Sequence, residues 1–135
     1  QVYAAGQHDG RPWRVGIRDP RGEADDPFAV LEVRDVSVST SGDYERFFEL
    51  NGTRYHHILN PRTGWPARDL RSATVISPSA TQADGLSTAL FVLGPERGLA
   101  LAEALKSVEA ITVDAAGHVG VTAAAPLVSM RRPGG

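Results

Sequence analysis

Apolar and polar residues alternate in short stretches along both ends of the chain, and this two-residue period is typical of half-buried strands. The pair Asn51-Gly52 separates two such stretches and predicts a tight hairpin turn, because both residue types tolerate positive φ angles. An Asp-Gly pair within residues 7–10 predicts a second hairpin that joins the first two strands. The predicted strands are residues 2–5, 12–17, 28–33, 36–39, 44–50, 53–59, 72–77, 109–114 and 119–122.

After the predicted strand that ends at residue 77, the apolar residues recur at a different spacing. Leu86, Leu90 and Leu93 recur at three- and four-residue intervals and predict a helix with one buried face. We predict that Thr81 begins this helix and that Asp84, three residues later, completes a capping box in place of the usual glutamate.

Turn-forming residues mark the ends of the remaining segments. Gly94 and Pro95 end the first helix and begin a second, which we predict over residues 96–106. Residues 19–27 are charged and rich in Pro, Gly and Asp, so they predict a solvated loop, and residues 131–135 predict a frayed tail. Antiparallel hairpins with two consecutive helices favour an α+β fold, with the sheet built as an antiparallel meander.

Composition narrows the function classes. A chain of 135 residues fits one domain with its own core. The formal net charge is −2 and no Lys/Arg run exceeds two residues, which argues against a nucleic-acid partner or an anionic membrane surface. The absence of cysteine excludes disulfides, thiolate metal sites and a cysteine nucleophile. No apolar run is long enough for a transmembrane segment, and these features leave the compartment open.

Asp84 and Thr88 are four residues apart on the predicted helix, so their oxygen atoms share one face. Hard oxygen ligands suit Mg²⁺, which commonly takes one or two carboxylates from a protein and completes its shell with water and phosphate oxygens. A purely structural interpretation is the alternative, in which Asp84 binds first-turn amides and Thr88 bonds back to a helix carbonyl.

Two adjacent histidines, His56 and His57, end a predicted strand beside a turn, where an imidazole can exchange a proton or meet a phosphate. Neighbours on a strand face opposite sides, so the two cannot share one ligand. In the turn that follows, Thr63 and the Gly64 amide are candidates to hold a phosphate or a nucleotide edge, and a stiff loop is the alternative.

The segment Ser41-Gly42-Asp43-Tyr44 is a further candidate. Gly42 permits a close approach of the backbone to a ligand, and Tyr44 can pack on that ligand. A bend between two strands is the alternative explanation.

Four motifs occur in a fixed order: SGDYER, YHHI, NPRTGWP and SATVISPSATQADGLSTALFVLG. In this order and spacing they resemble the C-terminal half of the ApbE family, the FAD:protein FMN transferases, over roughly residues 11–114. The resemblance implies the C-terminal part of an ApbE-like, T-fold-related domain. It also leads us to expect that residues 1–135 are the C-terminal portion of one such domain, whose N-terminal half is absent. Gly85 departs from the family pattern, in which alanine is common, and we expect it to cost the helix up to ~1 kcal/mol.

The resemblance implies a set of site residues. It assigns Mg²⁺ to Asp84 and Thr88, places His57 at the active site with His56 as its flank, and makes FAD the substrate. The catalytic residues it implies are His57 and Asp84, and the residues it implies for FAD binding are Ser41, Gly42, Asp43, Tyr44, His57, Thr63 and Gly64.

The implied reaction is Mg²⁺-dependent transfer of FMN from FAD to a Ser or Thr hydroxyl of an acceptor flavoprotein, with release of AMP. Hydrolysis of FAD to FMN and AMP is one alternative. A non-catalytic flavin-binding or partner-binding module is another, since an incomplete domain would need its missing half in trans or would self-associate. Family members are often found in the cell envelope or periplasm.

Overall fold

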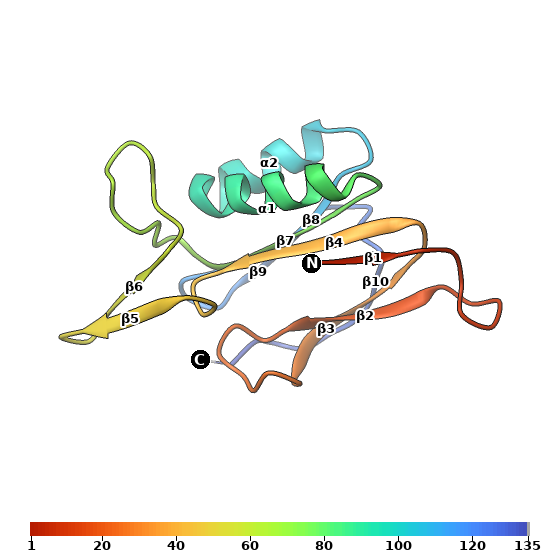
Figure 1. Cartoon of the computed structure of the whole chain (residues 1–135), viewed down its shortest axis with the longest axis horizontal. Coiled ribbons are helices and arrows are strands. Elements are labelled where there is room, and N and C mark those ends of the chain that lie inside the picture. The colour runs from red at the N-terminus through yellow and green to blue at the C-terminus, as the bar shows by residue number, and fades with distance from the viewer. Residues whose placement is uncertain (135) are drawn as a thin grey trace.

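The structure is a computed structural model and describes residues 1–134. It has three layers: two helices lie on one face of a five-stranded sheet, and a three-stranded sheet covers the other face (Figure 1). All strand pairs are antiparallel, which confirms the predicted α+β class. Among the described residues, no helix combines the length and apolar character needed to cross a bilayer.

The five-stranded sheet has the order β1-β4-β7-β8-β9, the three-stranded sheet has the order β10-β3-β2, and β5 and β6 form a separate hairpin that projects from the body (Figure 1). The helices are consecutive in the chain. The bounds are β1 Val2–Ala4, β2 Trp13–Arg18, β3 Pro27–Val33, β4 Val36–Gly42, β5 Phe47–Leu50, β6 Thr53–His56, β7 Leu70–Ser77, α1 Ala80–Leu93, α2 Pro95–Ala104, β8 Glu109–Asp114, β9 Val119–Val121 and β10 Leu127–Met130.

Two hydrophobic cores fill the spaces between the layers. Leu90 and Phe91 of α1 pack with Val75 in the core between the helices and the central sheet. Phe28 of β3 packs with Ile76 in the core between the two sheets. Val75 and Ile76 are neighbours on β7, so the alternation of side chains along this central strand supplies both cores.

The first predicted hairpin is wrong in its pairing. Asp9 and Gly10 adopt positive φ angles, and His8 and Arg11 form a local bridge, so the turn itself is present. However, β1 pairs with β4, and β2 pairs with β3. The chain changes sheets at this turn, and the two strands then contribute Ala4 and Ile17 to the same core between the two sheets.

The helix start is also corrected. α1 begins at Ala80, and Ser79 is the N-cap, with its hydroxyl accepting a hydrogen bond from the Gln82 amide at 3.2 Å. Asp84 lies beyond the first turn and caps nothing, so the predicted capping box from Thr81 does not form. The carboxylate of Asp84 is therefore not needed for the helix end.

The loop at residues 19–27 and the C-terminal tail differ from the prediction because they bind each other. Asp19 is buried and accepts hydrogen bonds from the Arg131 guanidinium at 3.0 Å and the Gly134 amide at 2.8 Å. Arg131 also pairs with Asp26 at 2.6 Å. The tail is thus held through residue 134, and β10, which precedes it, was not predicted.

Candidate functional site

One side of α1 lies against β4, and five oxygen-bearing side chains from the two elements meet there. The Ser41 hydroxyl is 3.0 Å from the Thr88 hydroxyl and 2.9 Å from the Ser87 hydroxyl. Ser39 donates to the Asp84 carboxylate over 3.4 Å. Asp84 and Thr88 are both exposed, whereas Ser87 and Ser39 are buried beneath them.

Two periodicities bring these residues together. Ser39 and Ser41 are two apart on β4 and so face the same side of the sheet, toward α1. Asp84 and Thr88 are four apart and so share one face of the helix. Ser39 and Ser87 were missed in the sequence, although the alternation of serines along β4 is a signal that a polar strand face meets another polar surface.

The oxygen atoms of this cluster suit a hard cation. Residues 1–134 hold no group of three or more His, Cys, Asp or Glu side chains that would surround a metal ion. Asp84 supplies one carboxylate and Thr88 supplies one hydroxyl on an exposed surface. Such a sparse donor set fits Mg²⁺ that takes most of its ligands from water and a phosphate-bearing substrate.

The two adjacent histidines have opposite environments. His56 is buried: its Nδ1 accepts from the Ile58 amide at 3.2 Å, its Nε2 donates to the Ala67 carbonyl at 2.7 Å, and its ring meets Phe91 edge-on. Since an amide N–H can only donate, Nδ1 must be unprotonated, which defines a neutral tautomer. Both nitrogens of His56 are therefore used within the fold.

His57 is exposed directly after β6, and its Nδ1 lies 3.2 Å from the carbonyl oxygen of Arg46. A carbonyl only accepts, so the proton sits on Nδ1 and the lone pair of Nε2 points outward. Of the two histidines, His57 is thus the one with a nitrogen available to accept a proton from an incoming group.

The Tyr44 ring lies directly against Gly42, so these two residues contact each other. A Cβ added at Gly42 would lie 2.4 Å from a ring carbon of Tyr44, so glycine is required here by the tyrosine ring. The Arg18 guanidinium lies 4.9 Å from the centre of that ring. Burial and the nearby Glu45 raise the pKa of Tyr44 to about 12, so the phenol stays protonated.

The Asp43 carboxylate is buried and is already paired with two arginine side chains. Arg21 donates to both of its oxygens at 2.7 Å, and Arg54 approaches one of them to 3.5 Å. Asp43 therefore anchors two arginines to the end of β4, and a direct contact between Asp43 and FAD stays a prediction.

The turn that follows His57 satisfies its own polar groups. The Gly64 amide donates to the Asn60 carbonyl at 2.8 Å, and the Thr63 hydroxyl accepts from the Trp65 amide at 3.2 Å. The Gly64 amide is thus not available to a phosphate in this conformation. Both residues are exposed, and Thr63 lines a cavity of ≈ 480 Å³; the role of Thr63 and Gly64 in FAD binding stays a prediction.

The structure brings Ser41, Asp84 and Thr88 into one cluster, and their assignment to FAD and Mg²⁺ stays a prediction. No hydrogen bond or ion pair within residues 1–134 joins this cluster to His57, Thr63 or Gly64. These lie instead in the projecting hairpin β5–β6 and the loop after it (Figure 1). A ligand that uses both groups would have to bridge them.

Similar proteins carry the same region. A protein of Treponema pallidum (strain Nichols), named FAD:protein FMN transferase, is 52% identical over 102 residues, which is 75% of this chain and 28% of that protein. A Vibrio cholerae protein with the same name is 45% identical over 97 residues, 71% of this chain and 29% of its own length. The chain thus spans less than a third of these curated relatives.

Solved structures agree with this similarity. The ApbE protein of Thermotoga maritima superposes with a TM-score of 0.79 at 41% identity, over 87% of this chain and 38% of that one. Flavinyl transferase ApbE of Pseudomonas stutzeri, apo form, has a TM-score of 0.70 at 44% identity. The match covers 90% of this chain and 38% of that one. The model of the ApbE family matches residues 1–112. On this match and these likenesses, the chain belongs to the ApbE family.

Proposed function

We propose that this chain acts in the transfer of FMN from FAD to a Ser or Thr hydroxyl of an acceptor protein, with AMP as the second product. Membership of the ApbE family and the names of the relatives support this reaction class. The observation that carries the proposal is the oxygen cluster on one surface, where Asp84 and Thr88 of α1 meet Ser39 and Ser41 of β4.

In this reaction the acceptor oxygen forms a bond to the phosphorus on the FMN side of the pyrophosphate. The bond from that phosphorus to the bridging oxygen breaks, and AMP carries the bridging oxygen away. His57 is assigned to accept the hydroxyl proton at Nε2, since its Nδ1 proton is bonded to the Arg46 carbonyl. Asp84 is the second candidate for this proton.

Asp84 and Thr88 are the residues assigned to hold Mg²⁺, which would neutralise charge on the pyrophosphate. Ser41 fixes the direction of the Thr88 hydroxyl through the 3.0 Å contact, and Ser39 restrains the Asp84 carboxylate. These serines are positioning residues: they arrange the two ligand side chains before any ligand binds.

Intact-mass measurement of an acceptor protein tests the proposal. The chain is incubated with FAD, Mg²⁺ and an acceptor that the Treponema relative modifies, both alone and in a chimera in which it replaces the matching region of that relative. We expect the chimera to add one FMN per acceptor and to release an equal amount of AMP. Asp84→Ala should abolish both products, and Asp25→Ala, which removes an exposed loop carboxylate, should leave them unchanged.

FAD hydrolysis is a second candidate, because Asp84 and Thr88 are exposed and water can reach them. The same measurement separates the possibilities. Hydrolysis releases FMN and AMP without an adduct on the acceptor. A chimera that releases no AMP with Mg²⁺ present would overturn both reactions and favour a binding module.

A further inference from the structure

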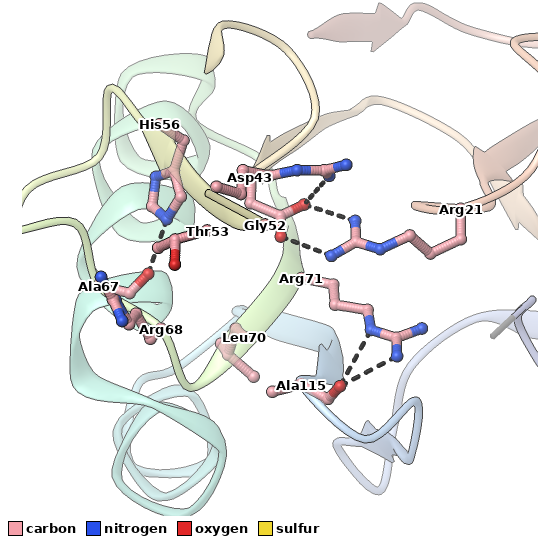
Figure 2. Close-up of a pocket in the computed structure, with 11 residues that line it drawn as sticks. Arg21, Asp43, Gly52, Thr53, His56, Ala67, Arg68, Leu70, Arg71 and Ala115 are labelled. Carbon is pink, nitrogen blue, oxygen red and sulfur yellow. Dashed lines mark hydrogen bonds and ion pairs between the residues drawn. The ribbon is translucent and has the colours of Figure 1, made fainter. Parts of the chain in front are cut away.

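A second concave site lies at the end of the central sheet, where β4 ends and β7 begins. It is a cavity of ≈ 340 Å³ lined by four arginines and one carboxylate, and this volume lies within the range of small-ligand pockets. Arg21 and Arg71 enter from one side, and His56 and Arg68 lie on the other side (Figure 2). The charged lining residues are Arg21, Asp43, Arg54, Arg68 and Arg71.

This cavity is distinct from the oxygen cluster on α1. It is lined by His56, whereas His57 does not line it. Neither Asp84 nor Thr88 lines it, and Asp43 is the one lining residue that the resemblance had assigned to FAD.

The positive charge in the cavity exceeds what the lining carboxylate can balance. Asp43 is shared, because it pairs with Arg21 at 2.7 Å and with Arg54 at 3.5 Å. Glu49, an exposed residue outside the cavity, takes the other side of the Arg54 guanidinium at 3.1 Å. These two arginines are therefore fixed in place and are formally balanced by the two carboxylates, so the net positive charge of the cavity comes from the other two lining arginines, Arg68 and Arg71.

Arg71 has no carboxylate partner within residues 1–134. Its guanidinium is partly buried and donates only to carbonyl oxygens, to Ala115 at 2.9 Å and to Gly134 at 2.8 Å. Carbonyl dipoles orient the group without neutralising its charge. Arg71 is thus a preorganised cation at the wall of the cavity (Figure 2).

Arg68 is the fourth arginine that lines the cavity. Its guanidinium lies 6.0 Å from the centre of the Tyr55 ring, and no hydrogen bond or ion pair from this side chain is made within the described chain. Its donors can turn to a ligand at little cost, since they give up no protein partner.

We propose that this cavity binds a phosphate dianion, either free phosphate or the phosphate group of a small monoester such as a nucleoside monophosphate. Arginine presents its N–H groups in a planar fork that matches phosphate oxygens, and charge-assisted hydrogen bonds of this kind are the strong ones. Several arginines held around an open cavity lower the cost of bringing such an anion out of bulk water. The proposal does not depend on the transferase reaction.

Two-dimensional amide NMR of this chain tests the site directly. Inorganic phosphate and adenosine 5′-monophosphate are titrated separately, with sodium chloride at equal ionic strength and succinate as controls. We expect saturable shifts of the Gly52, Thr53 and Ala115 amides, which line the cavity, and no matching shifts at Asp84 or Thr88. Tighter binding of the monophosphate than of phosphate would identify a nucleotide as the source, and equal binding would identify the phosphate group alone.

Substitutions test which side chains bind the anion. Arg54→Gln and Arg68→Gln should each weaken phosphate binding by about tenfold, because each removes a charge-assisted contact. Arg97→Gln, on the exposed face of α2, is the matched control and should leave the affinity unchanged. Arg71→Gln should weaken binding further but also loosens the tail, so its fold is checked by the same spectrum.

The proposal is overturned if succinate or chloride produces the same shifts as phosphate, which would indicate general charge screening. It is also overturned if phosphate binds Arg54→Gln and Arg68→Gln as well as it binds the unmodified chain. Shifts confined to residues 84–88 would instead place the anion at the oxygen cluster and would bear on the proposed function, not on this cavity.

Discussion

At the scale of single residues, two adjacent histidines with identical side chains have different surroundings and therefore different expected roles. His56 uses both ring nitrogens inside the fold, and His57 keeps one toward solvent. His56→Asn should therefore lower the free energy of unfolding by about 1–3 kcal/mol, because buried partners are left unpaired. His57→Asn should leave stability within about 0.5 kcal/mol and slow FMN transfer by about 10²–10⁴-fold. Urea unfolding and the transfer rate of the chimera measure the two effects, and the reverse ranking would assign the wrong histidine to the site.

The hydroxyl cluster gives a second prediction at this scale. Thr88→Val keeps the side-chain shape and removes the oxygen, and Ser41→Ala removes the group 3.0 Å from it. Both should raise the Mg²⁺ concentration that gives half-maximal binding in a calorimetric titration with FAD and the chimera, with the larger effect from Thr88→Val. Thr81→Val, at an exposed position of the same helix, is the control. An unchanged Mg²⁺ titration for Thr88→Val would make Thr88 a structural residue.

At the scale of elements, the glycines of the two helices differ in the space around them. A Cβ added at Gly85 meets no atom within 4 Å, whereas one at Gly98 would lie 3.0 Å from the Leu90 carbonyl oxygen on α1. Gly85→Ala should thus stabilise the fold by up to ~1 kcal/mol through helix propensity. Gly98→Ala should be destabilising, because the helix backbones must separate. Thermal unfolding of both variants checks the pair, and a gain at Gly98 would mean that the α1–α2 contact is looser than the structure describes.

The contact between the loop at residues 19–27 and the tail makes stability depend on pH. Burial raises the pKa of Asp19, but the amides of Arg21 and Gly134 and the Arg131 side chain outweigh it and hold the pKa below its ordinary value of 3.8. A depressed carboxyl pKa stabilises the folded state above the ordinary value, and this contribution is lost as the pH falls through the depressed value.

Asp19→Asn should accordingly lower the melting temperature at pH 7, and the difference from the unmodified chain should shrink below pH 3.8. Circular dichroism melts at several pH values measure it. Asp25→Asn, in the same loop but exposed, should show no such convergence. A difference that stays constant with pH would mean that the Asp19 charge does not stabilise the tail.

At the scale of the whole molecule, β1 is an edge strand with large apolar side chains in solvent. Val2 is 45% and Tyr3 is 53% exposed, and a cavity of ≈ 390 Å³ separates β1 from β2. Open apolar edges favour pairing with another chain. We therefore expect this chain by itself to self-associate. We also expect it to bind FAD weakly, because no hydrogen bond or ion pair within residues 1–134 joins the oxygen cluster on α1 to His57, Thr63 or Gly64. Gel filtration and FAD fluorescence measure both, and micromolar FAD binding by a monomer would contradict the expectation.

Substitution at this edge isolates the cause of association. Tyr3→Lys places a charge on the exposed edge and should shift the chain toward monomer, because edge lysines oppose strand pairing. Tyr3→Phe keeps the apolar surface and should associate like the unmodified chain. If Tyr3→Lys associates to the same extent, the contact lies elsewhere, with the exposed Phe48 and Trp65 of the projecting region as the next surface to test.

Features set by neighbouring residues could be predicted from the sequence alone. The hairpin at Asn51-Gly52, both helices and the shared face of Asp84 and Thr88 follow from φ preferences and the helical period, which act over a few residues. The order of four short motifs was also enough to identify the family. Only the tertiary structure decided which distant segments meet: the pairing of β1 with β4, the contact of Ser41 with Thr88 47 residues away, and the burial of Asp19 under the tail. Such contacts depend on which faces can be buried together in the compact chain, and local preferences carry no information about that choice.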